Sequence, residues 1–198
     1  MNLKELFIKD EKEYLEIKEI LSTTFQLQCE LPDQVFQKGY GSFLFGEYNH
    51  LFKEEFWNSI QELSKVSGDS YVVLAELENC YNEKMGWYEC VKIPVELTYE
   101  HYLDIFNMEE SDNGKFGLVH YGFYFVFTSP SLQWGIWAER DIETYVFSCK
   151  ENFKSKLAEI RLPGAFQLNE VTNHINSVYY DEEEAKRFCE KLLRNYKN

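Results

Sequence analysis

The sequence predicts a single α+β domain over residues 1–198, built mainly on an antiparallel sheet against which helices pack. The first indication is the segment 116–149, where three strand-like runs are separated by short polar turns, as in an antiparallel meander. The second is that apolar residues recur at three- and four-residue steps near the N-terminus, in the middle and at the C-terminus, which predicts helices. No repeat, low-complexity tract or linker divides the chain, so one domain is the simplest account.

The first quarter of the chain contains one regular and one irregular stretch. Residues 3–21 have helical spacing that is interrupted near Asp10, which predicts either one helix or two shorter ones. Residues 26–46 have no regular period. Their glycines indicate a flexible loop, because glycine is the most permissive residue in its backbone angles. This loop carries Tyr40.

Helix and strand patterns alternate in the middle of the chain. Apolar spacing predicts a helix over 49–66, and Gly68 stands where a helix-ending residue is expected. The runs 71–75 and 87–95 are rich in β-branched and aromatic residues and predict two strands. A short helix is expected over 98–106, capped by its first residue, a threonine.

Within the meander, alternation sorts the side chains of the first strand between two faces. One face is uniformly large and apolar and is expected to form the core: Val119, Tyr121, Phe123, Phe125 and Phe127. The other face, which includes His120 and Tyr124, is mixed, and we expect a helix, a loop or a partner to cover it. The second and third strands are predicted over 134–138 and 142–149, each preceded by a polar turn.

The remaining segments are a loop and a series of helices. The acidic, glycine-containing run 109–114 predicts a surface loop. Helical spacing appears over 150–160, over 168–178 and, most clearly, over 181–196. The last of these has acidic residues in its first turn and basic residues toward its end, an order that suits the helix dipole.

The excess of acidic residues indicates which classes of partner this protein can bind. Asp and Glu number 34 and Lys and Arg 20, so the formal net charge is -14. A field of this sign repels nucleic-acid phosphates and anionic membrane surfaces and attracts basic proteins. The sequence therefore predicts no nucleic-acid partner, no membrane and, as partner, a basic protein. The alternative is that the acidity only keeps the protein in solution.

Cysteine usage and the first residues indicate the cytoplasm. The five cysteines are odd in number and irregularly spaced, which favours free thiols in a reducing compartment over a disulfide framework. The N-terminal segment MNLKELFIKDEKEY has acidic residues where a signal peptide needs an apolar run. No stretch approaches the ~18 consecutive apolar residues of a membrane span. We therefore expect a cytoplasmic protein.

No recognised catalytic, cofactor-binding or metal-binding motif is found. The pair Gly39 and Gly41 lacks the further glycine of a phosphate-binding loop, and no histidine or cysteine pair has zinc-site spacing. The carboxylates of Glu139, Asp141 and Glu143 surround a turn, where we expect solvent to keep them as ordinary surface charges. We therefore expect no catalytic residue, no cofactor and no metal.

One hairpin carries a family resemblance. The segment SPSLQWGIWAERDIETYVF joins a Trp-Gly-aliphatic-aromatic strand, a charged turn and an aromatic-rich strand. It resembles a segment found in several families of small bacterial proteins that accompany polymorphic toxins as immunity proteins. The matching residues are Trp134, Gly135, Ile136, Trp137, Arg140, Asp141 and Tyr145. The resemblance covers about 20 of the 198 residues and implies a compact, acidic, non-enzymatic cytoplasmic protein that binds and blocks a partner.

The leading hypothesis is therefore a non-enzymatic protein-binding module. Aromatic side chains are good interface anchors, and we expect Tyr40 and Trp137 to be exposed and to serve in this way. Glu139 and Asp141 are expected to form the polar rim of the contact. The competing interpretation makes Trp137 an ordinary core residue.

Two other classes of function stay open at this point. One is a small-molecule-binding domain or enzyme with a pocket between the mixed sheet face and a helix, lined by His120, Tyr124 and Trp134. The other is a structural subunit of a larger assembly. The sequence decides neither between these classes nor the oligomeric state.

Overall fold

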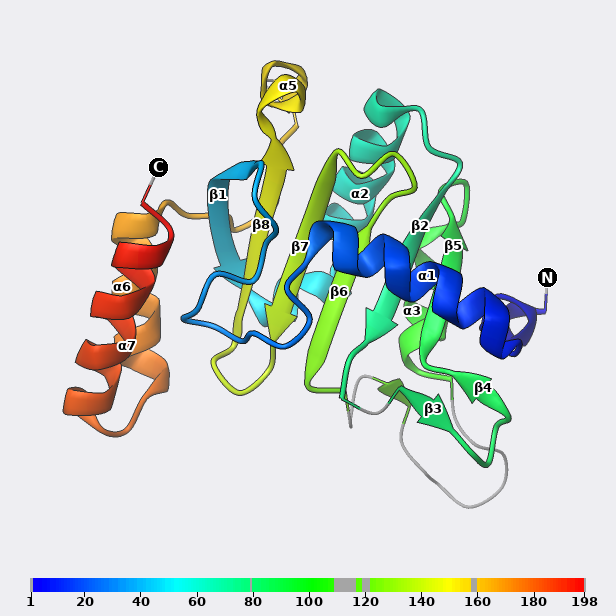
Figure 1. Ribbon diagram of the computed structural model, residues 1–198, viewed down its shortest axis with the longest axis horizontal. Helices are drawn as coiled ribbons and strands as arrows, with labels where there is room; N and C mark the ends of the chain where they lie inside the picture. Colours follow the sequence, from blue (N-terminus) through cyan, green and yellow to red (C-terminus); the bar gives the residue numbers. More distant parts are fainter. Residues whose placement is uncertain (1, 79, 109–116, 119–121, 158–159, 198) are drawn as a thin grey trace.

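The computed structural model describes residues 2–78, 80–108, 117–118, 122–157 and 160–197. It confirms the predicted α+β fold, in which helices flank one six-stranded antiparallel sheet (Figure 1). In spatial order the strands are β1 (Tyr40–Glu47), β8 (Thr144–Lys150), β7 (Trp134–Glu139), β6 (Tyr124–Thr128), β2 (Tyr71–Glu76) and β5 (Cys90–Pro94). A separate two-stranded sheet pairs β3 (Tyr81–Asn82) with β4 (Trp87–Tyr88). The predicted strand over 87–95 is therefore divided in two, at Glu89.

The predicted meander, β6-β7-β8, forms the middle of the large sheet, but both of its faces are buried. We name these faces after the helices that cover them, α2 (Glu54–Ser67) and α1 (Glu11–Thr24). On the α2 face, Phe127 pairs with Ile136 and Ile136 with Phe147. On the α1 face, Val126, Trp137 and Val146 are aligned in the same way, and all six side chains are at most 1% exposed.

The predicted core face of the first strand is confirmed at Phe125 and Phe127, and the other face is covered, as expected, so that a core lies on each side. Phe125 and Phe127 do lie in the core of the α2 face, but Val126 is equally buried on the other side. Phe123 precedes β6 and is 37% exposed. Residues 119–121 lie outside the described residues. A strand that is covered on both sides has apolar residues on both faces. Its sequence therefore lacks the clear alternation of apolar and polar residues that identifies a single core face.

Two of the predicted helices cover the α2 face. They are α2 (Glu54–Ser67) and α3 (Tyr99–Phe106), which lie behind the sheet in Figure 1. A 3-10 helix, η2 (Tyr48–Phe52), precedes α2, so the predicted helix over 49–66 has a break. Gly68 ends α2 with φ at +79°, a left-handed conformation that glycine adopts without strain. At the end of β8, α5 (Glu151–Lys154) and η3 (Ser155–Leu157) take the place of a longer predicted helix.

The α1 face has a different cover. The helix α1 (Glu11–Thr24) crosses the front of the sheet, and the pair α6 (Leu168–Val178) and α7 (Glu182–Asn195) lies beyond β1 (Figure 1). A 3-10 helix, η1 (Leu3–Glu5), precedes α1, as the predicted break near Asp10 requires. Asp10 caps α1 by accepting a hydrogen bond from the backbone N–H of Glu13 at 2.9 Å. The segment 25–36, which is neither helix nor strand, runs beside α1 over the same face.

The predicted loop over 26–46 is wrong in its second half, which forms the edge strand β1. Tyr40 is the first residue of this strand and pairs with Lys150. The glycines adapt the strand to its surroundings: a Cβ on Gly46 would lie 2.3 Å from the ring of Tyr145. Between Gly41 and Leu44 the register shifts, as in a β-bulge. A glycine-rich edge strand with a bulge has the composition of a loop, which is why the pattern was misleading.

Three further predictions concern the cysteines, membrane-spanning segments and the surface loop over 109–114. All five cysteines lie among the described residues, and all five are free thiols, as predicted. Among the described residues, no helix is long and apolar enough to cross a membrane. The predicted surface loop over 109–114 lies outside the described residues.

Candidate functional site

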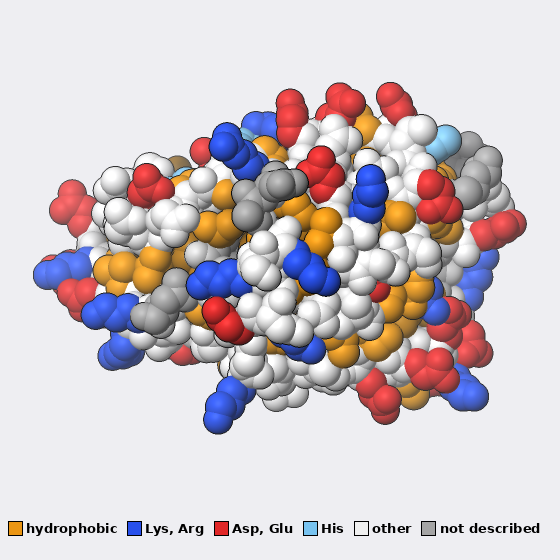
Figure 2. All heavy atoms as spheres, turned by 90° about the horizontal axis from the view of Figure 1, so that it is seen from above, with side chains coloured by type: hydrophobic (Ala, Val, Ile, Leu, Met, Phe, Trp, Pro, Cys, Tyr) orange, Lys and Arg blue, Asp and Glu red, His pale blue; other side chains and the backbone are white. Residues whose placement is uncertain are grey.

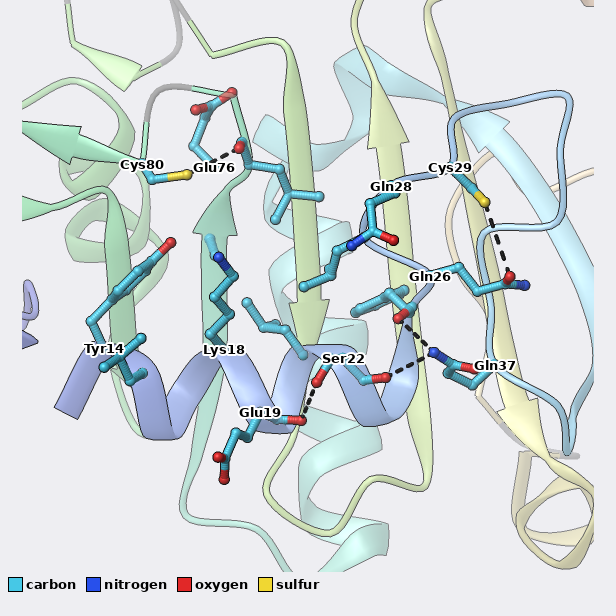
Figure 3. A pocket seen from close by; sticks show the side chains of 16 residues that line it. Tyr14, Lys18, Glu19, Ser22, Gln26, Gln28, Cys29, Gln37, Glu76 and Cys80 are labelled. Carbon is cyan, nitrogen blue, oxygen red and sulfur yellow. Dashed lines mark hydrogen bonds between the residues drawn. The ribbon is translucent and has the colours of Figure 1, made fainter. Parts of the chain in front are cut away.

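A groove lies on the α1 face between α1, the segment that follows it and the end of β2 (Figure 3). It consists of two hollows, of about 690 Å³ and 320 Å³, which share Leu27, Gln28, Cys29 and Leu77 in their walls. We call them together the α1 groove; it is lined by residues 14–15, 18–19, 21–22, 25–30, 37, 75–78, 80, 124 and 137. Because they share these residues, the two hollows adjoin.

The wall formed by residues 25–36 is held by side-chain amides. Gln26 donates from Nε2 to the carbonyl oxygens of Gln34 (2.8 Å) and Phe36 (2.9 Å). Gln37 donates in the same way to the carbonyl oxygens of Ser22 (2.9 Å) and Phe25 (3.1 Å) (Figure 3). An irregular segment has no ladder to satisfy its backbone, so these amides take over that role. The wall is therefore a built structure rather than a loose loop.

Aromatic and aliphatic side chains form one rim of the larger hollow. The rings of Tyr14 and Tyr88 are stacked at 4.0 Å with 7° between their planes, and Tyr81 packs on Tyr88 at 4.8 Å. Tyr81 is 50% exposed and Leu15, one turn of α1 from Lys18, is 52% exposed. Burial and the neighbouring Cys80 raise the pKa of Tyr14, so this phenol stays neutral. The rim offers flat apolar surface with few charges.

The charges divide the groove into two ends. In the larger hollow, the Lys18 side chain points from α1 toward the strands, whereas Glu19 points away from them (Figure 3). In the smaller hollow, the lining includes the exposed carboxylates of Glu30 and Glu78. Glu76 also contributes to the lining of the larger hollow, but it is buried and its carboxylate accepts from the backbone of residues 123 and 124. The smaller hollow is thus the acidic end.

A buried carboxyl group stands behind that acidic end. Glu139, the last residue of β7, is 5% exposed. Its Oε1 accepts hydrogen bonds from the backbone N–H of Leu31 at 2.6 Å and from the indole N–H of Trp137 at 2.7 Å. Burial, together with the nearby charges of Glu30 and Asp141, raises the pKa of Glu139 to about 7, and the two hydrogen bonds oppose this rise.

We call this end the acidic corner and define it by Glu30, Glu78, Tyr124, Glu139 and Asp141. The register places Tyr124 directly opposite Glu139, and the Tyr124 hydroxyl donates to Glu30 at 3.1 Å. Burial and the carboxylates around it raise the pKa of Tyr124. A cluster of acids around one half-buried hydroxyl favours a cationic ligand group.

Three of the four predicted contact residues meet at this corner, but not as exposed anchors. Trp137 is 1% and Glu139 5% exposed, and Tyr40 is 9% exposed, so the expectation that these residues form an exposed surface is wrong. Trp137 is the core residue of the competing interpretation, although it contributes to the wall of the smaller hollow. Asp141 is exposed. Tyr40 lies near the opposite end of the β7-β8 hairpin, where its hydroxyl donates to the carbonyl oxygen of Leu132 at 2.8 Å.

The expectation that Glu139 is an ordinary solvated carboxylate is wrong for the same reason. The tight turn spans residues 140–143, one residue later than predicted, so Glu139 belongs to the strand. The segment 25–36 then covers it and supplies the Leu31 N–H. Nothing near Glu139 in the sequence signals this cover, because the partner residue is 108 positions away.

The pocket predicted near His120 is not supported in its described part. His120 lies outside the described residues. Tyr124 points to the α1 face, with Trp137, whereas Trp134 points to the α2 face and is fully buried in its core. Residues on opposite faces of one sheet do not line the same pocket.

Within the described residues, no group of three or more His, Cys, Asp or Glu side chains is placed to hold a metal ion. Apart from Tyr124 and Trp137, the residues of the α1 groove come mainly from α1, from the segment after it and from the end of β2. Sequence reasoning missed this site because none of these segments carries a motif of its own. The alternation of polar and apolar residues over 25–30 (FQLQCE) is the only local signal of a lining segment.

The chain matches no family model, no curated protein and no solved structure.

Proposed function

We propose that this chain is a non-enzymatic binding protein that holds a basic, extended segment of a partner protein in the α1 groove. The observation that carries the proposal is the acidic corner. Glu30 and Glu78 present exposed carboxylates there, and the exposed Asp141 adds to the negative field. A lysine or arginine side chain is the complementary group.

The shape of the groove supports an extended segment. Two adjoining hollows with a shared wall accommodate successive residues of a chain, whereas a compact ligand needs only one of them. Gln28 is exposed on the shared wall, and its amide offers both donors and an acceptor to a peptide backbone. Leu15 and Tyr81 offer exposed apolar surface beside the larger hollow, and such side chains are good anchors.

The net charge by itself does not show where on the surface a basic partner binds. Acidic side chains are spread around the view of Figure 2, with lysines and arginines among them. An excess of -14 accelerates the approach of a basic partner, and salt screens this effect. Specificity therefore has to come from the groove, where charge and shape act together.

An immunity-type inhibitor is the narrower form of this proposal, and it rests on the hairpin resemblance. The matching residues Trp134, Gly135, Ile136 and Trp137 are all buried, so they are not the contact surface. Gly135 has a structural reason to be glycine: a Cβ there would lie 2.7 Å from Thr24 Cγ2 and 2.8 Å from Phe25 Cζ. In this proposal the hairpin builds the wall of the groove, and the acidic corner meets the toxin.

A second candidate function is the binding of a small organic cation. The larger hollow, at about 690 Å³, lies within the ~300–1,000 Å³ range of small-molecule sites. Tyr14 lines this hollow, and its ring suits a flat or cationic ligand, because aromatic rings attract cations. This candidate replaces the earlier one near His120.

The test is the binding of a fluorescent octalysine peptide, capped at both ends, measured by anisotropy at physiological ionic strength. The double variant Glu30→Gln, Glu78→Gln removes the two exposed charges of the corner. We expect its affinity to fall roughly tenfold or more, since about 1.4 kcal/mol of lost interaction corresponds to a factor of ten.

The matched control is Glu62→Gln, Glu96→Gln, which removes two exposed charges outside the groove. Its affinity is expected to stay close to that of the wild type. Equal losses in the two double variants would mean that only net charge matters and would contradict the groove as the site. If octalysine does not bind and small aromatic amines raise the melting temperature, the second candidate function is favoured.

A further inference from the structure

We infer that the binding of a cationic group at the acidic corner is coupled to the release of one proton from Glu139. This inference rests on the proposed function and adds to it a regulation by pH. It makes Glu139 a positioning residue whose charge state sets the affinity of the groove.

The geometry ties Glu139 to three residues that line the smaller hollow. Trp137 lines it and donates its indole N–H to Glu139. Glu30 lines it and immediately precedes Leu31, whose N–H donates to the same oxygen. Tyr124 lines it and faces Glu139 across the β6-β7 pair. Glu139 itself does not line the hollow, but a cation that enters it meets residues that are hydrogen-bonded to Glu139 or paired with it.

While the groove is empty, the surroundings of Glu139 favour its protonated form up to about pH 7. The groups that face it among the described residues are carboxylates, from Glu30 and Asp141, and the hydroxyls of Tyr124, Tyr179 and Tyr196. They come from the segment after α1, from the β7-β8 turn, from β6 and from the ends of α6 and α7. Burial and these carboxylates disfavour the charged form, so the pKa of Glu139 lies at about 7.

A bound cation reverses that balance. It neutralises the field of Glu30 and Glu78 and attracts the charged form of Glu139 directly. The carboxyl group then loses its proton to solvent, and the carboxylate accepts the Leu31 and Trp137 hydrogen bonds more strongly. Binding is therefore tighter at a pH above the pKa that Glu139 has in the free protein, because no proton then has to leave. Below that pH, binding is weaker.

The experiment measures the affinity for capped octalysine between pH 5.5 and pH 8.5 in wild-type protein and in Glu139→Gln. Lysine ammonium groups do not titrate in this range, so the peptide contributes no pH dependence. We expect the wild type to bind roughly tenfold more tightly at the upper end, which corresponds to a change of one unit in the pKa of Glu139. The variant keeps an oxygen that accepts from Leu31 and Trp137 and is expected to lose this dependence. Calorimetry in two buffers of different ionisation enthalpy counts the released proton.

A second variant covers the case in which Glu139→Gln does not fold. Asp141→Asn removes an exposed neighbouring charge and is expected to move the midpoint of the pH profile to lower pH. If octalysine binds with the same affinity at all pH values, or if the profile is the same in the variants, the coupling is overturned and the proposed function stands. If octalysine does not bind at any pH, both are overturned.

Discussion

The two faces of the sheet are covered in different ways, and the difference explains where the groove lies. On the α2 face, the two regular helices α2 and α3 close the core. On the α1 face, the irregular segment 25–36 shares the cover with α1, and α6 and α7 pack on the same core beyond β1. A helix satisfies its own backbone, whereas an irregular segment needs partners from outside.

The buried polar groups follow that distinction. On the α1 face, Thr24 Oγ1 lies 3.2 Å from both the Tyr40 hydroxyl and Thr128 Oγ1, and Glu139 accepts the N–H of Leu31. On the α2 face, Ser64 Oγ donates to the Ile60 carbonyl oxygen, within its own helix. Polar side chains also join elements on the α2 face, where Trp57 Nε1 donates to the Leu97 carbonyl oxygen at 2.8 Å and the Tyr102 hydroxyl donates to the Leu51 carbonyl oxygen at 2.7 Å. The α1 face differs because its cover includes the irregular segment 25–36, which the buried Glu139 carboxyl group helps to hold. The hollows in which a ligand fits lie along this irregular part of the cover.

The largest expected effect is on the α2 face. Phe125 is fully buried there and packs against Phe106 and Tyr48 at 5.4 and 6.1 Å between ring centroids. Phe125→Ala is expected to lower the free energy of unfolding by about 3–5 kcal/mol, because it leaves a cavity in a close-packed core. Denaturation by urea measures the loss. A cost below about 1 kcal/mol would mean that this core is loosely packed and would end the contrast between the faces.

The next effect is the dependence of stability on pH through Glu139. Its pKa is about 7 in the folded protein, in place of the ordinary 4.5. A raised carboxyl pKa contributes stability below pH 4.5 that is lost as the pH rises through 7, by roughly 3 kcal/mol in all. Glu139→Gln is therefore expected to be more stable than the wild type at pH 8 and to lack this part of the slope. Urea denaturation at several pH values checks the difference, and parallel wild-type and variant curves would contradict it.

The sequence predicted the regular elements of both faces better than the irregular segment 25–36 and the edge strand β1, which complete the α1 face. Helical periodicity placed α2, α3, α6 and α7, and the meander was confirmed, because these patterns are local. The edge strand β1 was missed, since its glycines serve contacts with residues about 100 positions away. Pairing between residues so far apart in the chain produces no pattern in the local sequence.

The candidate site was predicted only in part. The hairpin that carries Trp137, Glu139 and Asp141 does border the groove, but their burial depends on the segment 25–36, which has no regular period. A strand pattern identifies which residues are paired, and it does not identify what covers them. Burial of Glu139 is therefore a tertiary property.

A smaller effect is expected at the closest approach of α1 to the sheet. Gly135→Ala places a Cβ against Thr24 and Phe25, where the nearest atoms would lie 2.7 and 2.8 Å away. We expect a loss of about 1–3 kcal/mol, because the end of α1 has to move. Gly41→Ala is the matched control, since nothing lies within 4 Å of a Cβ there. Equal effects of the two substitutions in urea denaturation would show that this contact is not close.

The smallest effect compares one buried hydroxyl on each face. Thr128 Oγ1 donates to the Trp134 carbonyl oxygen at 3.0 Å and joins the hydroxyl of Thr24. Thr128→Val keeps the shape and removes the hydroxyl, so we expect a loss of about 1–2 kcal/mol from unsatisfied buried groups. Thr128 is completely buried although it is the last residue of β6, so solvent does not replace the lost contacts.

On the α2 face, Ser64→Ala is expected to change the free energy of unfolding by less than about 0.5 kcal/mol. The Ile60 carbonyl oxygen that Ser64 contacts keeps its hydrogen bond within the helix, so no group is left unsatisfied. Urea denaturation of both variants gives the comparison directly. If Thr128→Val were as mild as Ser64→Ala, polar contacts would not hold the cover of the α1 face. The groove would then need another explanation, such as poor packing of the apolar side chains at the end of α1.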